Sequence, residues 1–103
     1  MRVPKDIPDE AADYWRRNAP LCSAMGTLRD QDYSAFLALC LTWAAYIRTA
    51  TDPNAHPNSI VALNNRLVVQ QGRFGLDPYS RKKLGIDLDK RDENDLDALL
   101  GLN

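Results

Sequence analysis

The sequence predicts an all-α fold, a small helical domain of two long helices plus short flanking helices. Apolar residues recur at spacings of three and four in both long segments, which is the period of a helix that packs along one side. Glycine and proline residues separate the segments where they would end one helix and start the next. The alternation of polar and apolar residues that is typical of a strand occurs nowhere in the chain.

The composition predicts one globular domain with polar ends. A chain of 103 residues, 45% hydrophobic and 26% charged, can bury one modest core. It has no apolar run near the ~20 residues that cross a bilayer, and residues 1–10 lack the apolar region of a signal peptide, so we expect a cytoplasmic protein without membrane contact. We expect a flexible arm over residues 1–8, a helical core over 9–85, and an acidic linker and tail over 86–103.

The net charge of −1 hides a difference between the two ends of the chain. Residues 1–85 carry 11 Lys/Arg and 8 Asp/Glu, a balance of +3, whereas residues 86–103 carry 2 and 6, a balance of −4. Opposite balances suggest two partners, one of them anionic. The alternative is that the acidic end only keeps the protein in solution.

The first helix is predicted to begin at Asp9, because acidic residues suit a helix N-terminus. Residues 1–8 before it are predicted to be extended or disordered. Pro20 is predicted to kink or restart this helix, which leaves a second piece over residues 20–25. Gly26 then provides the stop.

The clearest helix is predicted from Asp30 or Asp32, in its first turn, to about Ala50. Its apolar stripe consists of Tyr33, Phe36, Leu37, Cys40, Leu41, Ala44 and Ile47. Trp43 lies off this stripe, so the helix has apolar side chains on a second side, and a contact between subunits is one explanation.

The third main helix is predicted to start after Pro57, with Asn58 or Ser59 near its cap, and to stop at Gly75. Its apolar side carries Ile60, Leu63, Leu67 and Phe74.

A short helix is predicted next, because Asp77 and Pro78 are a typical cap and first residue; it would end near Gly85. The polar, charged segment that follows is predicted to be a linker. The last residues form a small apolar cluster that could fold as one amphipathic turn on a partner, and its members are Leu96, Leu99, Leu100 and Leu102.

The side chains suggest binding rather than catalysis. There is no Gly-rich phosphate loop, no paired metal ligands and no Ser–His–Asp or Cys–His set, so we expect no enzymatic activity, metal or cofactor. Cys22 and Cys40 fall on apolar helical sides and are interpreted as buried small hydrophobes, with a disulfide or metal site as the alternative. His56 precedes a proline at a loop end, where it would cap a helix or lie on the surface.

Two basic groups are the candidate nucleic-acid contacts. They are Arg16 with Arg17 on the first helix, and Arg81, Lys82 and Lys83 at the end of the short helix. Such groups supply the sequence-independent phosphate contacts that dominate affinity for nucleic acids. The alternative is a solvated helical face, with the second group placed favourably near a helix C-terminus.

Two stretches resemble one known family, in the same order. Residues 9–50, DEAADYWRRNAPLCSAMGTLRDQDYSAFLALCLTWAAYIRTA, match a Trp-Arg-Arg helix, a Pro-Leu step, a Gly-x-Leu turn and an Asp-opened helix with Leu-Cys. Residues 56–85, HPNSIVALNNRLVVQQGRFGLDPYSRKKLG, match a His-Pro start, a helix with Asn and Leu, a Phe-Gly-Leu-Thr-Pro turn and a Ser-Arg-x-Arg-Leu ending. On these residues, about three quarters of the chain, the sequence resembles the small terminase subunit of tailed bacteriophages. Residues 74–78 with Ser80 and Arg81 are the specific part.

The resemblance implies a non-enzymatic DNA-packaging adaptor. Proteins of that family assemble into rings, bind viral double-stranded DNA and bring it to the large terminase subunit, which holds the ATPase and nuclease. For this chain the resemblance implies a ring-like homo-oligomer in the host cell cytoplasm. It also implies DNA contacts from the basic groups, and contact between the C-terminal leucines and the large subunit.

Three departures from the family pattern affect this expectation. The arm before the Trp helix is short, with Arg2 and Lys5 as its cations, and the connection over residues 49–56 is shorter than usual. Asp77 replaces the family's Thr and caps equally well, whereas Arg29 replaces a residue that would cap the second helix. The alternatives are a helical protein–protein interaction module of phage origin without DNA binding, and a compact helix-turn-helix factor whose reading helix would be short.

Overall fold

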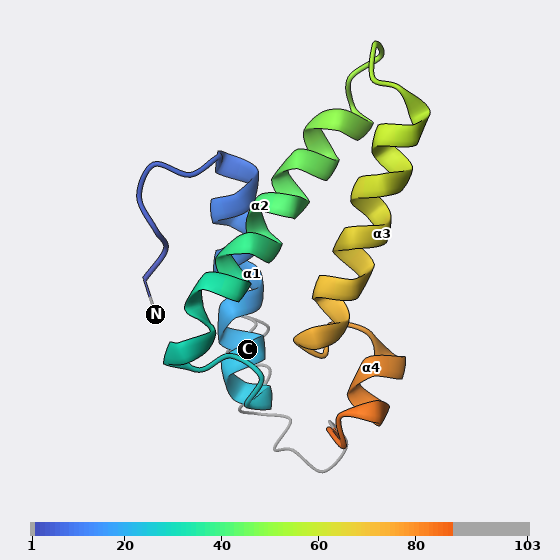
Figure 1. Ribbon diagram of the computed structural model, residues 1–103. Coiled ribbons are helices and arrows are strands. Elements are labelled where there is room, and N and C mark those ends of the chain that lie inside the picture. Colours follow the sequence, from blue (N-terminus) through green and yellow to red (C-terminus); the bar gives the residue numbers. More distant parts are fainter. Residues whose placement is uncertain (1, 88–103) are drawn as a thin grey trace, which may run out of the picture.

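The computed structural model describes residues 2–87, and in that range the protein is all-α (Figure 1). Its helices are α1 (Asp9–Met25), the short 3-10 helix η1 (Asp30–Asp32), α2 (Tyr33–Ala50), α3 (Pro57–Arg73) and α4 (Pro78–Lys83). α2 packs against both α1 and α3, and α4 folds back beside the end of α3. The predicted fold class is confirmed for these residues, whereas the ring-like assembly stays a prediction.

The core lies between α1 and α2 and is closed by the end of α3. Its largest fully buried side chains are Trp15, Phe36, Leu39, Cys22 and Cys40. The ring of Phe36 meets two others edge to face, Trp15 with centroids 5.0 Å apart and Phe74 with centroids 5.3 Å apart. Because Phe74 directly follows α3, this contact joins the third helix to the core built by the first two.

α1 is one continuous helix through Pro20, so the predicted restart at that residue is wrong. A proline inside a helix removes the hydrogen bond to the carbonyl four residues earlier, here that of Arg16, and its ring crowds that carbonyl. The buried side chains of Ala19 and Cys22, on either side of the proline in sequence, hold this part of the helix against the core. Gly26, with a φ of 79°, follows the helix as predicted.

α2 and η1 together occupy the predicted range, but the buried stripe is displaced. The side chains that α2 buries are Phe36, Leu39, Cys40 and Ala44. Leu39 was not in the predicted stripe, and Leu41, which was, is 40% exposed. Trp43 packs its ring against Tyr14 of α1, with centroids 5.1 Å apart, so its position off the stripe is explained within one chain.

α3 begins earlier than predicted. His56 is its N-cap, with Nδ1 accepting the backbone N–H of Asn58 at 3.1 Å, and Pro57 is its first residue. The prediction of Asn58 or Ser59 as the cap is therefore wrong, and the capping role predicted as one option for His56 is confirmed. Leu67 is the one residue that α3 buries, so most of this helix faces solvent.

Two smaller predictions concern the arm and the cysteines. Residues 2–8 form no helix, and the arm bends at Asp6, which has a φ of 62°. Val3 and Ile7 of the arm pack against the core. Cys22 and Cys40 are free and buried, as predicted. Burial raises the pKa of Cys22 to about 11 and that of Cys40 to about 12, so both thiols stay protonated and unreactive at neutral pH.

Candidate nucleic-acid interface

α3 ends at a tightly bonded corner. Gly75 has a φ of 72°, in the left-handed region that glycine adopts without strain. The N–H of Gly75 donates to the carbonyl of Gly72, and the N–H of Leu76 donates to that of Gln71, both at 3.1 Å. These two bonds satisfy carbonyls that the helix end would leave free. The predicted stop at Gly75 is confirmed.

Asp77 starts α4 on the other side of the corner. Its carboxylate accepts the backbone N–H and the hydroxyl of Ser80, each at 2.8 Å, and Pro78 follows as the first residue, as predicted. The bond from the Ser80 N–H, helped by the hydroxyl, lowers the pKa of Asp77. A Cβ on Gly72 would lie 2.8 Å from the hydroxyl oxygen of Ser80, so α3 and α4 approach this closely because Gly72 has no side chain.

Thr27 ties this corner to the end of α1. Its hydroxyl donates to the carbonyl of Phe74 at 2.8 Å, and the thiol of Cys22 lies 3.8 Å from the same oxygen. The two stretches that carry the family resemblance therefore meet at this point. Thr27 was missed by the sequence reasoning, since nothing near it in sequence distinguishes it from any other loop threonine.

Arg81 binds the backbone of the corner. Its Nη1 donates to the carbonyl of Gly75 at 3.0 Å, and the side chain is half-buried. Arg81 is one of the predicted nucleic-acid contacts, but this bond directs its guanidinium toward the protein's own backbone. We therefore assign Arg81 to the architecture of the corner and leave it out of the candidate contact surface.

Lys82 and Lys83 are exposed at the end of α4, as their predicted role requires. The Nζ of Lys83 lies 5.9 Å from the ring centroid of Tyr79, a cation–π contact between neighbouring turns. A surface hollow of about 290 Å³ lies between α3 and α4, and both Arg73 and Lys83 line it. The fold thus brings together two cations that lie ten residues apart in the chain.

The sequence reasoning missed Arg73 and Arg66. Arg73 occupies the last turn of α3, and the chain reversal at Gly75 brings it close to Lys83. The sequence signal that could have revealed this pair is a cation placed just before a glycine stop that a second, capped helix follows. Arg66 and Arg73 are both exposed and seven residues apart, so they lie on one side of α3, roughly 10 Å apart along its axis. The exposed cations of the two helices form the α3–α4 basic surface, which consists of Arg66, Arg73, Lys82 and Lys83. α3 itself contains no acidic residue.

The other predicted basic group lies on a different part of the molecule. Arg16 and Arg17 are exposed on α1, which passes behind α2 in Figure 1, whereas α4 lies to the right, below α3. Arg16 forms an exposed ion pair with Asp13, with Nη1 and Oδ1 3.1 Å apart. A single ligand that touched both groups would have to reach from α1 to α4.

Some predictions fall outside the described residues. These are the predicted partner contacts Leu96, Leu99, Leu100 and Leu102, whose role stays a prediction. Within residues 2–87, no helix is both long enough and apolar enough to span a membrane. In the same range, no three His, Cys, Asp or Glu side chains are grouped so that they could hold a metal ion.

Comparison with known proteins gave no match to a protein-family model, to a curated protein or to a solved structure. Any assignment of function therefore depends on the residues of this chain and on the resemblance that they carry.

Proposed function

We propose that this chain is a small terminase subunit, which binds viral double-stranded DNA, oligomerises, and recruits or regulates the large terminase ATPase-nuclease for genome packaging. The resemblance of residues 9–50 and 56–85 to that family supports the proposal. The observation that carries its DNA-binding part is the α3–α4 basic surface, whose exposed cations lie at a corner held by caps and backbone bonds. Cations on a preordered corner lose less conformational freedom when they contact phosphates than cations on a loose tail.

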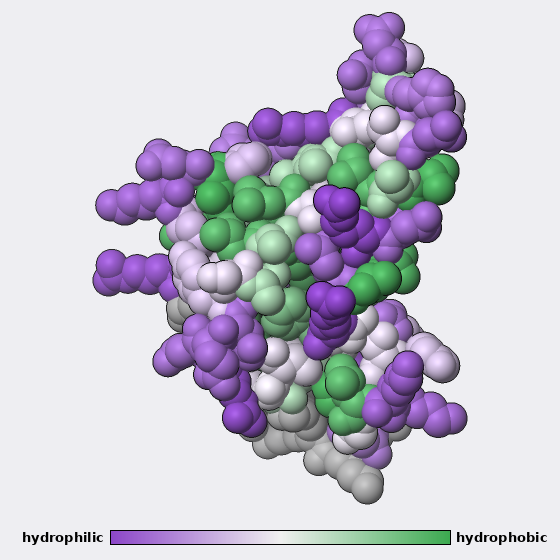
Figure 2. Space-filling model, in the orientation of Figure 1, coloured by the Kyte–Doolittle hydropathy of each residue, from purple (hydrophilic) through white to green (hydrophobic). Residues whose placement is uncertain are grey.

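Exposed valines on α3 support the homo-oligomer. Val61, Val68 and Val69 are 57%, 54% and 57% exposed, and Figure 2 shows hydrophobic atoms on the right-hand side of the molecule, over α3. Apolar side chains in solvent on one helix are what a contact between subunits would cover. Because Val68 and Val69 line the same hollow as Arg73 and Lys83, such a contact would place the cations at its rim. An assembly would then multiply a few phosphate contacts per subunit through effective concentration.

Salt-dependent binding to duplex DNA tests the proposal. The dissociation constants of the native assembly for two unrelated duplexes would be measured by fluorescence anisotropy over a range of salt concentrations. For Arg73→Ala/Lys82→Ala/Lys83→Ala we expect weaker binding to both duplexes by a similar factor. We also expect the log–log salt slope to become shallower by about 0.9 per lost phosphate contact. Unchanged affinity and slope would contradict a role of this surface in DNA binding.

The matched control is Arg16→Ala/Arg17→Ala, which removes two exposed cations from α1 and leaves the corner intact. We expect a smaller loss of affinity, because Arg16 is already paired with Asp13. Arg81→Ala is a poor first variant, since it also breaks the bond to the Gly75 carbonyl. Native mass measurement of each variant separates a role of the cations in DNA binding from a role in the contact between subunits. Loss of the assembly would assign them to the contact between subunits.

A phage-derived helical protein–protein interaction module without DNA binding is the second candidate. The bonding of Arg81 and Arg16 within the chain favours it, because each bond engages a cation that DNA binding would use. The exposed valines of α3 suit a protein partner equally well. If the native assembly fails to retard duplex DNA at low ionic strength, this candidate replaces the DNA-binding one.

A further inference from the structure

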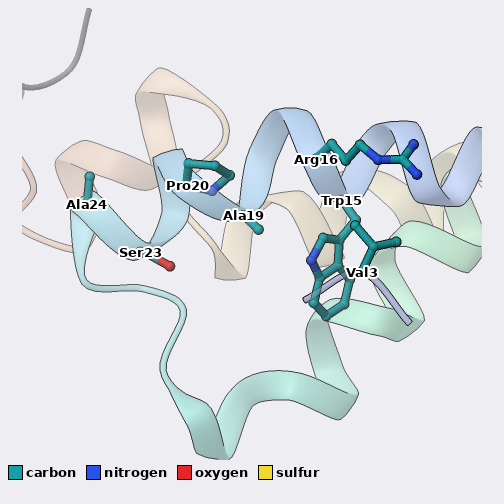
Figure 3. A pocket seen from close by; sticks show the side chains of 7 residues that line it. All are labelled: Val3, Trp15, Arg16, Ala19, Pro20, Ser23 and Ala24. Atoms are coloured by element: carbon teal, nitrogen blue, oxygen red, sulfur yellow. The ribbon is translucent and has the colours of Figure 1, made fainter. Parts of the chain in front are cut away.

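A pocket of about 610 Å³ lies on α1. Six residues of α1 between Trp15 and Ala24 line it, and Val3 of the N-terminal arm forms a further wall (Figure 3). The lining is mainly apolar, with Arg16 and Ser23 as its polar side chains. None of the functions considered so far uses this pocket.

The buried side chain of Trp15 forms one side of the pocket. The side chain of Trp15 is 1% exposed, and its Nε1–H has no partner among the described residues. Figure 3 shows this nitrogen on the edge of the ring that faces Ala19 and Ser23. A mainly apolar hollow of this kind suits a peptide segment with an aliphatic side chain.

We propose that the pocket holds the leucine-bearing end of the same chain, residues 96–102. A leucine side chain would fill the hollow beside the ring of Trp15. Charge supports this occupant: residues 86–103 carry a balance of −4, and Arg17 is exposed on the same helix as the pocket. Arg16 lines the pocket, and its exposed ion pair with Asp13 costs little to exchange for another carboxylate. Four of the last eight residues of the chain are leucines, so the segment supplies the required apolar group.

The connection is long enough for this contact within one chain. A Cβ on Gly75 would meet Ile86 Cδ1 at 3.2 Å and Thr27 Cγ2 at 3.7 Å, so the described chain ends close to the C-terminal end of α1. From that end of α1 back to Trp15 is roughly 15 Å along the helix axis. Residues 88–95 can extend over roughly 26 Å, and the tether would give the segment a high effective concentration at the pocket.

This contact would compete with the proposed recruitment of the large subunit, because both use the same leucines. The pocket would then store the segment until a partner displaces it. The inference goes beyond the proposed function and does not depend on DNA binding, so either can fail without the other.

The indole N–H signal of Trp15, in an NMR spectrum of the ¹⁵N-labelled full chain, tests the proposal. Trp43 is the internal reference. In Leu99→Ser/Leu100→Ser we expect the Trp15 signal to shift, because a leucine no longer packs beside its ring, while the Trp43 signal stays in place. The matched control is Leu41→Ser/Leu84→Ser, which changes two exposed leucines outside the pocket and should leave Trp15 unaffected. An unchanged Trp15 signal in Leu99→Ser/Leu100→Ser would overturn the proposal.

A variant of the pocket itself provides a second check. Ser23→Glu adds a negative charge to the lining and should release the acidic segment, with the same shift of the Trp15 signal. Ser34→Glu, an exposed serine on α2 outside the pocket, is its control. If the two glutamates affect Trp15 equally little, the occupant is not this segment.

A nitroxide label at Asn103→Cys identifies which chain supplies the segment. Cys22 and Cys40 are fully buried, so the label attaches to the new cysteine alone. We expect broadening of the amide signals of Ser23 and Ala24. In a second sample, ¹⁴N chains that carry the nitroxide are refolded together with ¹⁵N chains that lack it. Broadening of the Ser23 and Ala24 signals in this sample would place a second copy's tail in the pocket and overturn the assignment to the same chain. Absence of broadening in both samples would also overturn it, and would leave the pocket to a foreign partner.

Discussion

The two halves of the molecule are held together by different forces. Between α1 and α2, large side chains such as Trp15, Phe36 and Leu39 are removed from water almost completely. At the α3–α4 corner, α3 buries one residue and α4 buries none, and the geometry depends on caps and bonds to backbone carbonyls. Apolar burial is non-directional, whereas each bond at the corner sets a particular angle and distance.

This difference explains where the candidate surface lies. α2 buries four side chains in the core, Phe36, Leu39, Cys40 and Ala44, whereas α3 buries Leu67 alone. α3 needs little burial because its end is bonded to Thr27 and to α4, so valines and arginines can occupy its solvent side. The half of the molecule with the smaller core therefore leaves more of α3 exposed for a partner.

Phe36→Ala should have the largest effect, because Phe36 is the side chain that joins the two halves. It is fully buried and its ring contacts both Trp15 and Phe74. We expect the free energy of unfolding, measured by urea denaturation, to fall by about 3–5 kcal/mol. The control, Tyr79→Ala, changes a ring that is 74% exposed and should cost less than about 0.5 kcal/mol. A loss below about 1 kcal/mol for Phe36→Ala would show that the halves are stable independently.

Thr27→Val tests the bond between the halves without changing the size of the side chain. The valine cannot donate to the carbonyl of Phe74, so we expect the free energy of unfolding to fall by about 1 kcal/mol. Hydrogen exchange relative to the wild type should become faster for the α4 amides than for the α2 amides. Thr42→Val is the matched control, since the hydroxyl of Thr42 bonds only within α2, to the carbonyl of Ala38. Equal effects of the two substitutions would mean that Thr27 does not position the corner.

Local signals made most of the fold predictable. The cap at Asp77, the proline after it and the stop at Gly75 act within four residues of their own position, so a single sequence reveals them. The core cysteines were also predictable, because helical periodicity alone places them on an apolar side. Pro20 shows the limit of local signals: it predicted a break, but one missing hydrogen bond is outweighed by the packing of its neighbours.

The candidate site was less predictable, because it depends on contacts between distant residues. Arg81 looks like a free cation in the sequence, and its bond to Gly75 depends on the path of the chain through the corner. Arg73 and Lys83 share a hollow only because the chain reverses between them. Likewise, Leu41 was predicted in the core, but Leu39 is buried there and Leu41 is exposed. Which of the two faces the core depends on how α1 and α3 pack against α2, and helical spacing alone does not determine that packing.

The smallest effect is expected from the ion pair between Glu10 and Arg48, which links the start of α1 to the end of α2. The guanidinium of Arg48 lowers the pKa of Glu10 below its usual 4.5, and a second contact joins Nη2 to Oε1 at 3.3 Å. Because the pKa is lowered in the folded state, the pair contributes stability above the pKa of the unfolded chain. That contribution is lost as the pH falls through the folded-state pKa.

Glu10→Gln isolates this contribution. Asp77, whose pKa is also lowered, is present in both proteins, so its effect cancels in the difference between them. Between about pH 6 and about pH 3, the urea midpoint of the wild type should fall slightly more than that of Glu10→Gln, and added salt should shrink the difference. Parallel pH profiles would show that the pair contributes nothing measurable, as many exposed pairs do. The α1–α2 half would then be stabilised by apolar burial without help from charge, which would make its contrast with the corner sharper.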